Sequence, residues 1–215
     1  RLFCGVAATT VSLAAQTPPY GINEREANTS FAIRTSAPST DMSLRQVFAD
    51  RVGQLPVALT HAEDGSQRLF WLMKDGLIQV WHTDGDAVLS ARLFLVIRDQ
   101  VNSSHFESGL LSMAFHADYA DNGRFFVYYT HGEVVSRISE FRVSNANPDS
   151  ADASSERILL DIDQPSPSHF GGQLAFGSDG YLYVALGDGH GTDEDGVNLA
   201  QNPAFLQGSI LRIDV

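Results

Sequence analysis

The segment from His169 to Asp188, HFGGQLAFGSDGYLYVALGD, decides the fold. Two apolar stretches, Gln173–Phe176 and Tyr181–Leu186, flank the turn sequence at residues 177–180, Gly-Ser-Asp-Gly. Apolar runs joined by a short Gly- and Asp-containing turn predict a β-hairpin. The order of apolar strand, glycine-containing turn and aromatic strand recurs in Leu111–Thr130, LSMAFHADYADNGRFFVYYT. The sequence therefore predicts repeated antiparallel hairpins.

Strand patterns continue on both sides of this hairpin, whereas convincing helical spacing is absent after residue 55. The further strands are expected at Leu69–Met73, Leu77–Trp81, Phe125–Thr130, Ser136–Val143, Arg157–Ile162 and Ser209–Val215. Hairpin glycines recur at intervals of roughly 50 residues, which is typical of the blades of a β-propeller. We therefore expect an all-β propeller in residues 45–215. That span has room for about three blades, and because propellers close with about 4 to 8 blades, we expect it to be the N-terminal half.

The amino-acid composition argues against several kinds of partner and site. The 215 residues carry a net charge of −12, and an acidic surface repels phosphate backbones, so we expect no nucleic-acid partner. The single cysteine, Cys4, excludes an intrachain disulfide and a multi-cysteine zinc site.

The N-terminal region differs from the rest. Leu2–Ala15 is a run of small and apolar residues without charge, so residues 1–16 resemble the end of a truncated signal peptide. This run is too short to span a membrane, which takes about 20 apolar residues. We therefore expect a periplasmic or secreted protein without a membrane span. Residues 17–44, rich in Thr, Ser, Pro and Asn, are expected to form a linker or surface arm.

Three longer motifs carry a family resemblance. They are Gly109–His116 (GLLSMAFH), His169–Gly177 (HFGGQLAFG), and Gly187-Asp188-Gly189 followed by Gly208–Asp214 (GSILRID). Together they resemble the soluble quinoprotein glucose/sorbosone dehydrogenase family over roughly Gln46–Val215. The resemblance implies a six-bladed β-propeller that uses pyrroloquinoline quinone (PQQ) and Ca²⁺. Hedgehog-interacting-protein-like domains share the fold and many of these motifs.

His169 is the leading catalytic candidate. It follows Pro165 and Pro167 and precedes a Gly-Gly pair, which leaves room for a flat ligand. A lone loop histidine is more commonly structural, but the resemblance implies a general base that takes the proton of a sugar hydroxyl. The predicted hairpin returns Asp188 close to His169, and the resemblance implies that this carboxylate orients the imidazole. The alternative for Asp188 is a residue that closes a strand-end turn.

Two further residues are candidate substrate contacts. Glu107 stands where glucose-oxidising relatives carry an amide, and an ionised carboxylate accepts hydrogen bonds but cannot donate them. This departure argues against glucose as the specific substrate; the alternative is a surface Glu in a turn. The acidic loop Asp188–Asn198 (DGHGTDEDGVN) is better explained as a solvated rim than as a calcium site. Within it, the resemblance suggests Asp193 as a sugar contact.

The function implied by the resemblance is oxidation of an aldose at its anomeric hydroxyl, with a hydride passing to PQQ and His169 as general base. The cationic residues that hold PQQ and the Ca²⁺ ligands are expected after Val215, so we expect the 215-residue chain alone to be inactive. The electron acceptor stays open. One alternative is a non-catalytic propeller that binds a protein or glycan, and another is a lactonase that uses calcium-activated water.

Overall fold

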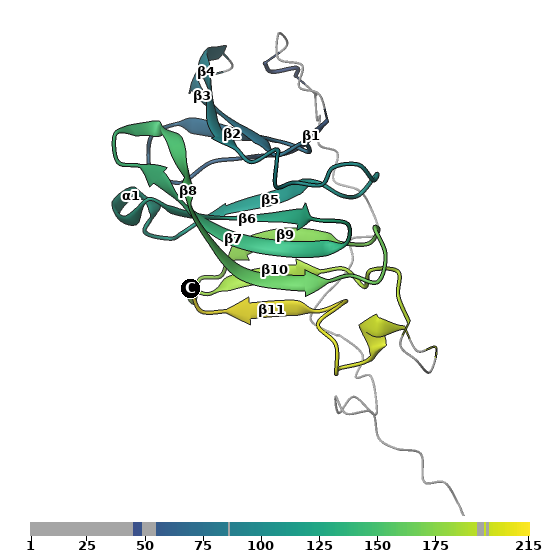
Figure 1. The fold of residues 1–215 in the computed structure, drawn as a ribbon. Coiled ribbons are helices and arrows are strands. Elements are labelled where there is room, and N and C mark those ends of the chain that lie inside the picture. Colours follow the sequence, from purple (N-terminus) through teal and green to yellow (C-terminus); the bar gives the residue numbers. More distant parts are fainter. Residues whose placement is uncertain (1–44, 49–54, 86, 193–195, 197) are drawn as a thin grey trace, which may run out of the picture. The chain divides into compact units, whose positions relative to one another are not determined.

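Antiparallel sheets built from consecutive strands dominate the computed structural model, which describes residues 45–48, 55–85, 87–192, 196 and 198–215 (Figure 1). These residues belong to a structural unit, Arg45–Val215, that is separate from residues 1–44. The predicted signal peptide (1–16), the predicted linker or arm (17–44) and Asp193 lie outside the described residues. Within the described part, no helix is long and apolar enough to cross a membrane.

Each of the three sheets follows chain order. The first sheet contains β1 (Pro56–Thr60), β2 (Arg68–Met73), β3 (Leu77–Asp84) and β4 (Ala87–Val96). The second contains β5 (Leu110–Phe115), β6 (Arg124–His131), β7 (Val135–Ser144) and β8 (Asn147–Asp163). The third contains β9 (Gly171–Phe176), β10 (Leu182–Leu186) and β11 (Ile210–Ile213). One helical turn, α1 (Tyr119–Asn122), and a short 3₁₀ segment (Leu199–Gln201) complete the described elements.

The hairpins that the sequence predicts are present. Leu182 pairs with Phe176 and Val184 with Leu174, so β9 and β10 form the hairpin around residues 177–180. Phe70 pairs with Val80 across the turn that contains Gly76. The prediction of an all-β fold is confirmed, and the three meandering sheets are consistent with part of a propeller.

Strand β6, in the second sheet, is almost wholly apolar at residues 125–129. Its side chains alternate between two faces, and both faces are buried. Phe125 and Tyr129 pack toward the first sheet, against residues such as Phe70 and Phe94. Phe126 and Tyr128 pack toward the third sheet, in a cluster that includes Leu174 and Val184. The second sheet is therefore covered on both faces by its neighbours, as expected for a sheet between two others.

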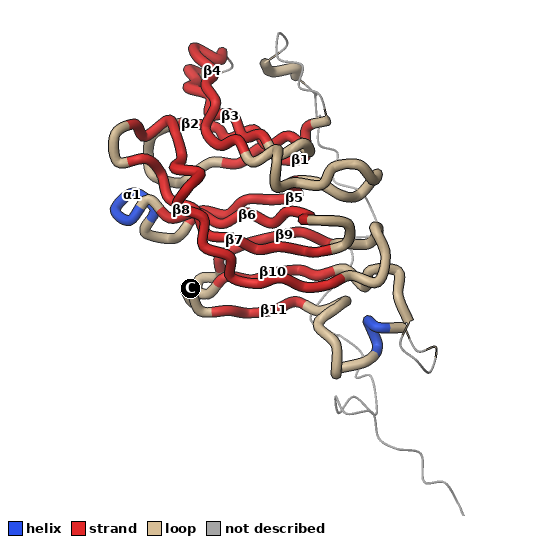
Figure 2. The backbone as a smooth tube through the Cα atoms, in the orientation of Figure 1, coloured by secondary structure: helices blue, strands red, loops and turns tan. Residues whose placement is uncertain are grey.

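The arrangement gathers particular loops at one end. The first strands of successive sheets are neighbours, because β5 contacts both β1 and β9. Since antiparallel strands alternate in direction, the loops that enter β5 (97–109) and β9 (164–170) lie at the same end as the loop that leaves β10 (187–209). These loops appear together on the right-hand side of Figure 2. This end of the sheets holds the candidate catalytic residues.

Candidate functional site

His169 and Asp188 are hydrogen-bonded partners. The imidazole Nδ1 of His169 lies 2.9 Å from Oδ1 of Asp188, and the two side chains are 46% and 23% exposed. An ionised carboxylate only accepts hydrogen bonds, so Nδ1 carries the donated proton and Nε2 keeps its lone pair. The pair therefore presents an acceptor nitrogen at an open surface, which is the arrangement required of a general base.

Backbone contacts bring the two residues together. Gly187 donates its N–H to the Phe170 carbonyl (3.0 Å), and Gly189 donates to the His169 carbonyl (3.1 Å). The buried Tyr128 hydroxyl also donates to the Phe170 carbonyl, at 2.8 Å. A Cβ at position 187 would lie 1.7 Å from the His169 carbonyl oxygen, so only glycine allows this close approach. The Gly-Asp sequence after β10 thus places the carboxylate beside the imidazole.

The Asp188 carboxylate is stabilised as an anion. The backbone N–H of His190 donates to Oδ1 at 2.9 Å, and this contact lowers the pKa of Asp188 below its usual value. The hydrogen bond from the His169 ring lowers the pKa further, and a contact from Asn198 adds to the effect. Asp188 therefore remains charged through the neutral range and can accept the Nδ1 hydrogen bond of the facing imidazole.

Glu107 makes a contact that its sequence position does not predict. Its Oε2 accepts a hydrogen bond from the backbone N–H of His169, across 62 residues of chain. His169 has φ +54°, in the left-handed region that non-glycine residues rarely adopt. Glu107 therefore fixes the backbone of the candidate base, and its predicted contact with substrate remains a prediction.

A cavity of about 300 Å³ adjoins this site. Its walls come from the first strands of the three sheets, the turn between β2 and β3, and the loops that enter β5 and β9. They include Val57, Lys74, Phe106, Glu107, Leu111, Phe170 and Gly171. Lys74 is the cationic side chain in this lining, and its Nζ donates to the His105 carbonyl. The cavity is thus mainly apolar, with one cation and one carboxylate, and shares Glu107 with the His169 site.

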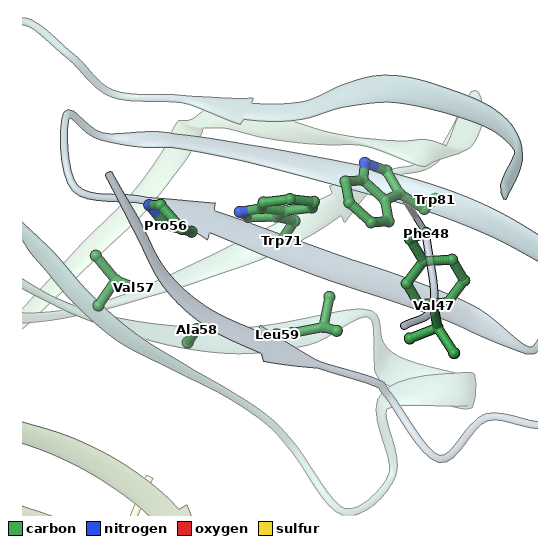
Figure 3. Close-up of a pocket in the computed structure, with 8 residues that line it drawn as sticks. All are labelled: Val47, Phe48, Pro56, Val57, Ala58, Leu59, Trp71 and Trp81. Carbon is green, nitrogen blue, oxygen red and sulfur yellow. The ribbon is translucent and has the colours of Figure 1, made fainter. Parts of the chain in front are cut away.

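A second cavity, of about 320 Å³, lies on the outer face of the first sheet (Figure 3). Its lining consists of apolar and aromatic side chains: Val47, Phe48, Pro56, Val57, Ala58, Leu59, Trp71 and Trp81. It contains no acid, base or nucleophile. We therefore place the candidate chemistry at His169 and treat this face as a packing surface.

The predicted roles of Ca²⁺ and of Asp193 are not tested by the described residues. Among the described residues, no group of three or more His, Cys, Asp and Glu side chains could hold a metal ion. The acidic loop is closed by an isolated bridge between Thr192 and Asn198, but Asp193 itself is not described. The roles predicted for Asp193 and Ca²⁺ stay predictions.

Sequence reasoning missed one residue at the site. The ring of His190 lies perpendicular to that of His169, with centroids 4.8 Å apart and an angle of 89°. His190 has no paired-ligand spacing with another histidine. Its proximity to Asp188 in sequence was the available signal, but its ring orientation depends on a left-handed backbone that sequence patterns do not reveal.

Comparisons with known proteins identify the family and the fold. A family model described as Glucose / Sorbosone dehydrogenase matches residues 54–215. Hedgehog-interacting protein from Mus musculus and from Homo sapiens is 38% identical over 172 residues, covering 74% of this chain and 24% of that protein. The PQQ-bound aldose sugar dehydrogenase of Streptomyces coelicolor has a TM-score of 0.61 at 23% identity. The match covers 78% of this chain and 47% of that one.

A second solved structure gives the same picture of the fold. The apo form of the soluble aldose sugar dehydrogenase from Escherichia coli has a TM-score of 0.58 at 23% identity, and the match covers 74% of this chain. The chain spans 44% of that dehydrogenase and 24% of Hedgehog-interacting protein.

Proposed function

The chain belongs to the glucose/sorbosone dehydrogenase family, and from this premise we propose that it takes part in oxidising an aldose at its anomeric hydroxyl, with His169 as general base. The observation that carries the proposal is the His169–Asp188 hydrogen bond, which leaves Nε2 as an exposed acceptor. The family match and the fold of sugar-oxidising structures support the substrate class.

In the proposed reaction, His169 Nε2 takes the proton of the anomeric hydroxyl. Asp188 holds the ring through Nδ1 and stabilises the imidazolium that results. The bond between the anomeric carbon and its hydrogen breaks as the C=O bond of a lactone forms. PQQ, when bound, supplies the acceptor for the departing hydride. Glu107 keeps the His169 backbone in place through the N–H contact and offers a hydrogen-bond acceptor beside the sugar.

The cavity beside Glu107 fits one end of a flat, anionic cofactor. Leu111, Phe170 and Gly171 provide apolar walls, and Lys74 provides one positive charge. PQQ has three carboxylates, and carboxylates in proteins pair best with Arg or Lys. Lys74 would neutralise one of them. We propose that the remaining cations, and the ligands for Ca²⁺, come from parts of the protein beyond those the structure describes.

We also propose that the three sheets are blades of a six-bladed propeller. The apolar outer face of the first sheet supports this, because Trp71 and Trp81 line a hollow there that another sheet would cover (Figure 3). Leu59 on the same face is 51% exposed. A periplasmic or secreted location, proposed from the apolar run at residues 2–15, would suit an enzyme that meets free sugars.

The test uses the full-length gene product loaded with PQQ and Ca²⁺. We expect a redox dye to bleach when aldoses such as glucose or galactose are added, but not with sorbitol, which has no anomeric hydroxyl. Quinone-loaded protein that reduces no dye with any aldose would contradict the proposal.

A second candidate is a non-catalytic propeller that binds a protein. The observation that favours it is the 38% identity to Hedgehog-interacting protein, which exceeds the 23% identity to the aldose sugar dehydrogenases. The two candidates differ in cofactor affinity. Isothermal titration with PQQ and Ca²⁺ should show a saturable site for the dehydrogenase and none for the binding module.

A further inference from the structure

The loop after β10 contains a strained residue beside the candidate base. His190 has φ +55°, in the left-handed region, where a Cβ-bearing side chain is disfavoured. The residue before it, Gly189, has φ +63° and adopts the same region without that penalty. Non-glycine residues in this conformation persist where the surroundings impose them, and they concentrate at functional sites.

His190 contacts both members of the dyad. Its backbone N–H donates to Asp188 Oδ1 at 2.9 Å, the same oxygen that faces His169 Nδ1 at 2.9 Å. Its ring meets the His169 ring edge to face, with centroids 4.8 Å apart. Glycine at position 190 would supply the same N–H without backbone strain. The imidazole side chain is therefore what His190 contributes beyond the N–H contact that glycine would also make.

The exposed position of His190 argues against a role in the core. The residue is exposed and belongs to neither of the two buried apolar clusters. His169 is 46% exposed, and the hydrogen bond to Asp188 holds one edge of its ring. The edge-to-face contact with His190 restricts the ring further, and an aromatic pair in this geometry is favourable.

Building on the oxidation proposed above, we propose that His190 is a positioning residue: its ring holds the His169 imidazole in the orientation that keeps Nδ1 on Asp188 and directs Nε2 to the sugar. A misdirected base lowers the rate of proton transfer without weakening substrate binding, because orientation contributes to the barrier. Loss of the ring should therefore reduce kcat and leave KM nearly unchanged.

The primary test compares His190→Gly with wild type in the full-length, quinone-loaded protein. Glycine keeps the N–H and relieves the left-handed strain, so we expect kcat to fall about tenfold while KM stays within about twofold and Tm does not fall. His190→Phe restores a ring and should recover most of kcat. A lower Tm together with the lower kcat would indicate a merely structural role and overturn the proposal, as would unchanged kcat.

A matched control relieves the same kind of strain elsewhere. Gln67 has φ +55° and is exposed in the loop between β1 and β2, at the opposite end of the sheets from His169. Gln67→Gly should therefore leave both kcat and KM at their wild-type values. A loss of kcat in this variant equal to that of His190→Gly would show a general effect of the substitution and overturn the proposal.

A second readout needs no sugar turnover. Carbethoxylation of His169 by diethyl pyrocarbonate, followed by peptide mass spectrometry, reports how freely its ring is approached. We expect His169 to react severalfold faster in His190→Gly than in wild type. This test separates the two proposals: faster modification in a protein that oxidises no aldose would support the ring contact and reject the dehydrogenase. An unchanged rate would overturn the role of His190.

Discussion

The side chain of His169 is 46% exposed while its Nδ1 is held by Asp188, and the proposed role of base rests on Nε2. In the full-length protein, His169→Ala should lower kcat by about 100-fold or more, because proton transfer to a positioned base is lost. Affinity for PQQ should change little, since the proposal does not make the His169 ring the charge partner of a PQQ carboxylate. Steady-state kinetics and quinone titration measure the two effects. His61→Ala, an exposed histidine at the other end of the sheets, is the control and should behave as wild type.

Asp188 contributes charge as well as shape. Its pKa is lowered first by the His190 N–H and then by the His169 ring, so it is an anion over the whole range in which histidine titrates. Asp188→Asn keeps the size but removes the charge that favours the imidazolium. We expect lower kcat and an acidic limb of the pH–rate profile that moves to lower pH. Full activity with an unshifted profile would reduce Asp188 to a turn residue.

For single residues, the sequence predicts which side chains belong to the candidate site better than it predicts the contacts between them. The proximity of His169 and Asp188 follows from a hairpin that returns the chain, and the structure brings them together. The contact between Glu107 and the His169 N–H joins two loops from different sheets, so no local pattern contains it. The ring of His190 depends on a backbone angle that the neighbouring glycines suggest but do not determine.

In the second sheet, an ionic network links strands β6, β7 and β8. Glu140 on β7, only 3% exposed, accepts hydrogen bonds from Arg124 on β6 and Arg157 on β8. Burial raises its pKa, but the two guanidinium groups outweigh burial and lower the pKa of Glu140 to about 2. The network's contribution to stability is therefore complete above the ordinary glutamate value of about 4.5 and is lost as pH falls toward about 2.

Glu140→Gln should remove that contribution. At neutral pH we expect the free energy of unfolding to fall by about 3 kcal/mol, because two arginines lose their partner. Between pH 4.5 and 2 the variant should lose less stability than wild type does. Urea unfolding at a series of pH values measures both effects. Glu133→Gln, in the exposed turn between β6 and β7, is the control. If Glu140→Gln lost no more free energy of unfolding than Glu133→Gln, the role of the network would be contradicted.

Strands whose side chains alternate or are buried on both faces are predicted well from sequence, and irregular ones are not. The stretch at 125–129 is apolar or aromatic throughout because both faces of β6 are covered. Strands β1 and β4 are absent from the predicted strands; in β4, Leu89 and Leu93 lie on the exposed side of the pattern. Strand β8 extends from residue 147, well before the predicted start at Arg157. Its first half is polar, so pairing with β7 and not apolar burial determines its length.

At the scale of the whole molecule, the outer faces of the first and third sheets expose apolar side chains. Leu59 is 51% exposed on one and Ile210 is 72% exposed on the other. Unpaired strand edges and apolar faces promote association. Expressed alone, the 215-residue chain should therefore elute as oligomers and oxidise no aldose when PQQ and Ca²⁺ are added. Light scattering after size exclusion and the dye assay measure these outcomes.

A substitution on the exposed face sharpens this test. Leu59→Asp adds a charge to the outer face of the first sheet without removing a buried side chain, so it should reduce association of the isolated chain. Trp71 lines the hollow on this face and is half-buried, whereas Trp81 is only 2% exposed, so the acrylamide-accessible part of the tryptophan fluorescence reports coverage of Trp71. A monodisperse wild-type monomer that oxidised aldoses would contradict the requirement for further blades.

The number of blades lies beyond what local patterns determine. Hairpin repeats predict the meander within each sheet, and the structure confirms it in three successive sheets. Closure depends on contacts between sheets far apart in the chain, which repeats of this length do not specify. Under the proposed function, the PQQ site shares this property, because its charge partners would come from several blades. Among the described residues, Lys74 is the cation that lines the cavity.

Product analysis tests the central claim most directly. Full-length wild-type protein and His169→Ala would be loaded with PQQ and Ca²⁺ and given one aldose, with the lactone quantified by mass spectrometry against the dye reduced. We predict one molecule of aldonolactone for every two electrons that reach the dye in wild type, and a rate about 100-fold lower in the variant. No lactone from quinone-loaded wild type, or equal rates from both proteins, would contradict oxidation at the His169–Asp188 site.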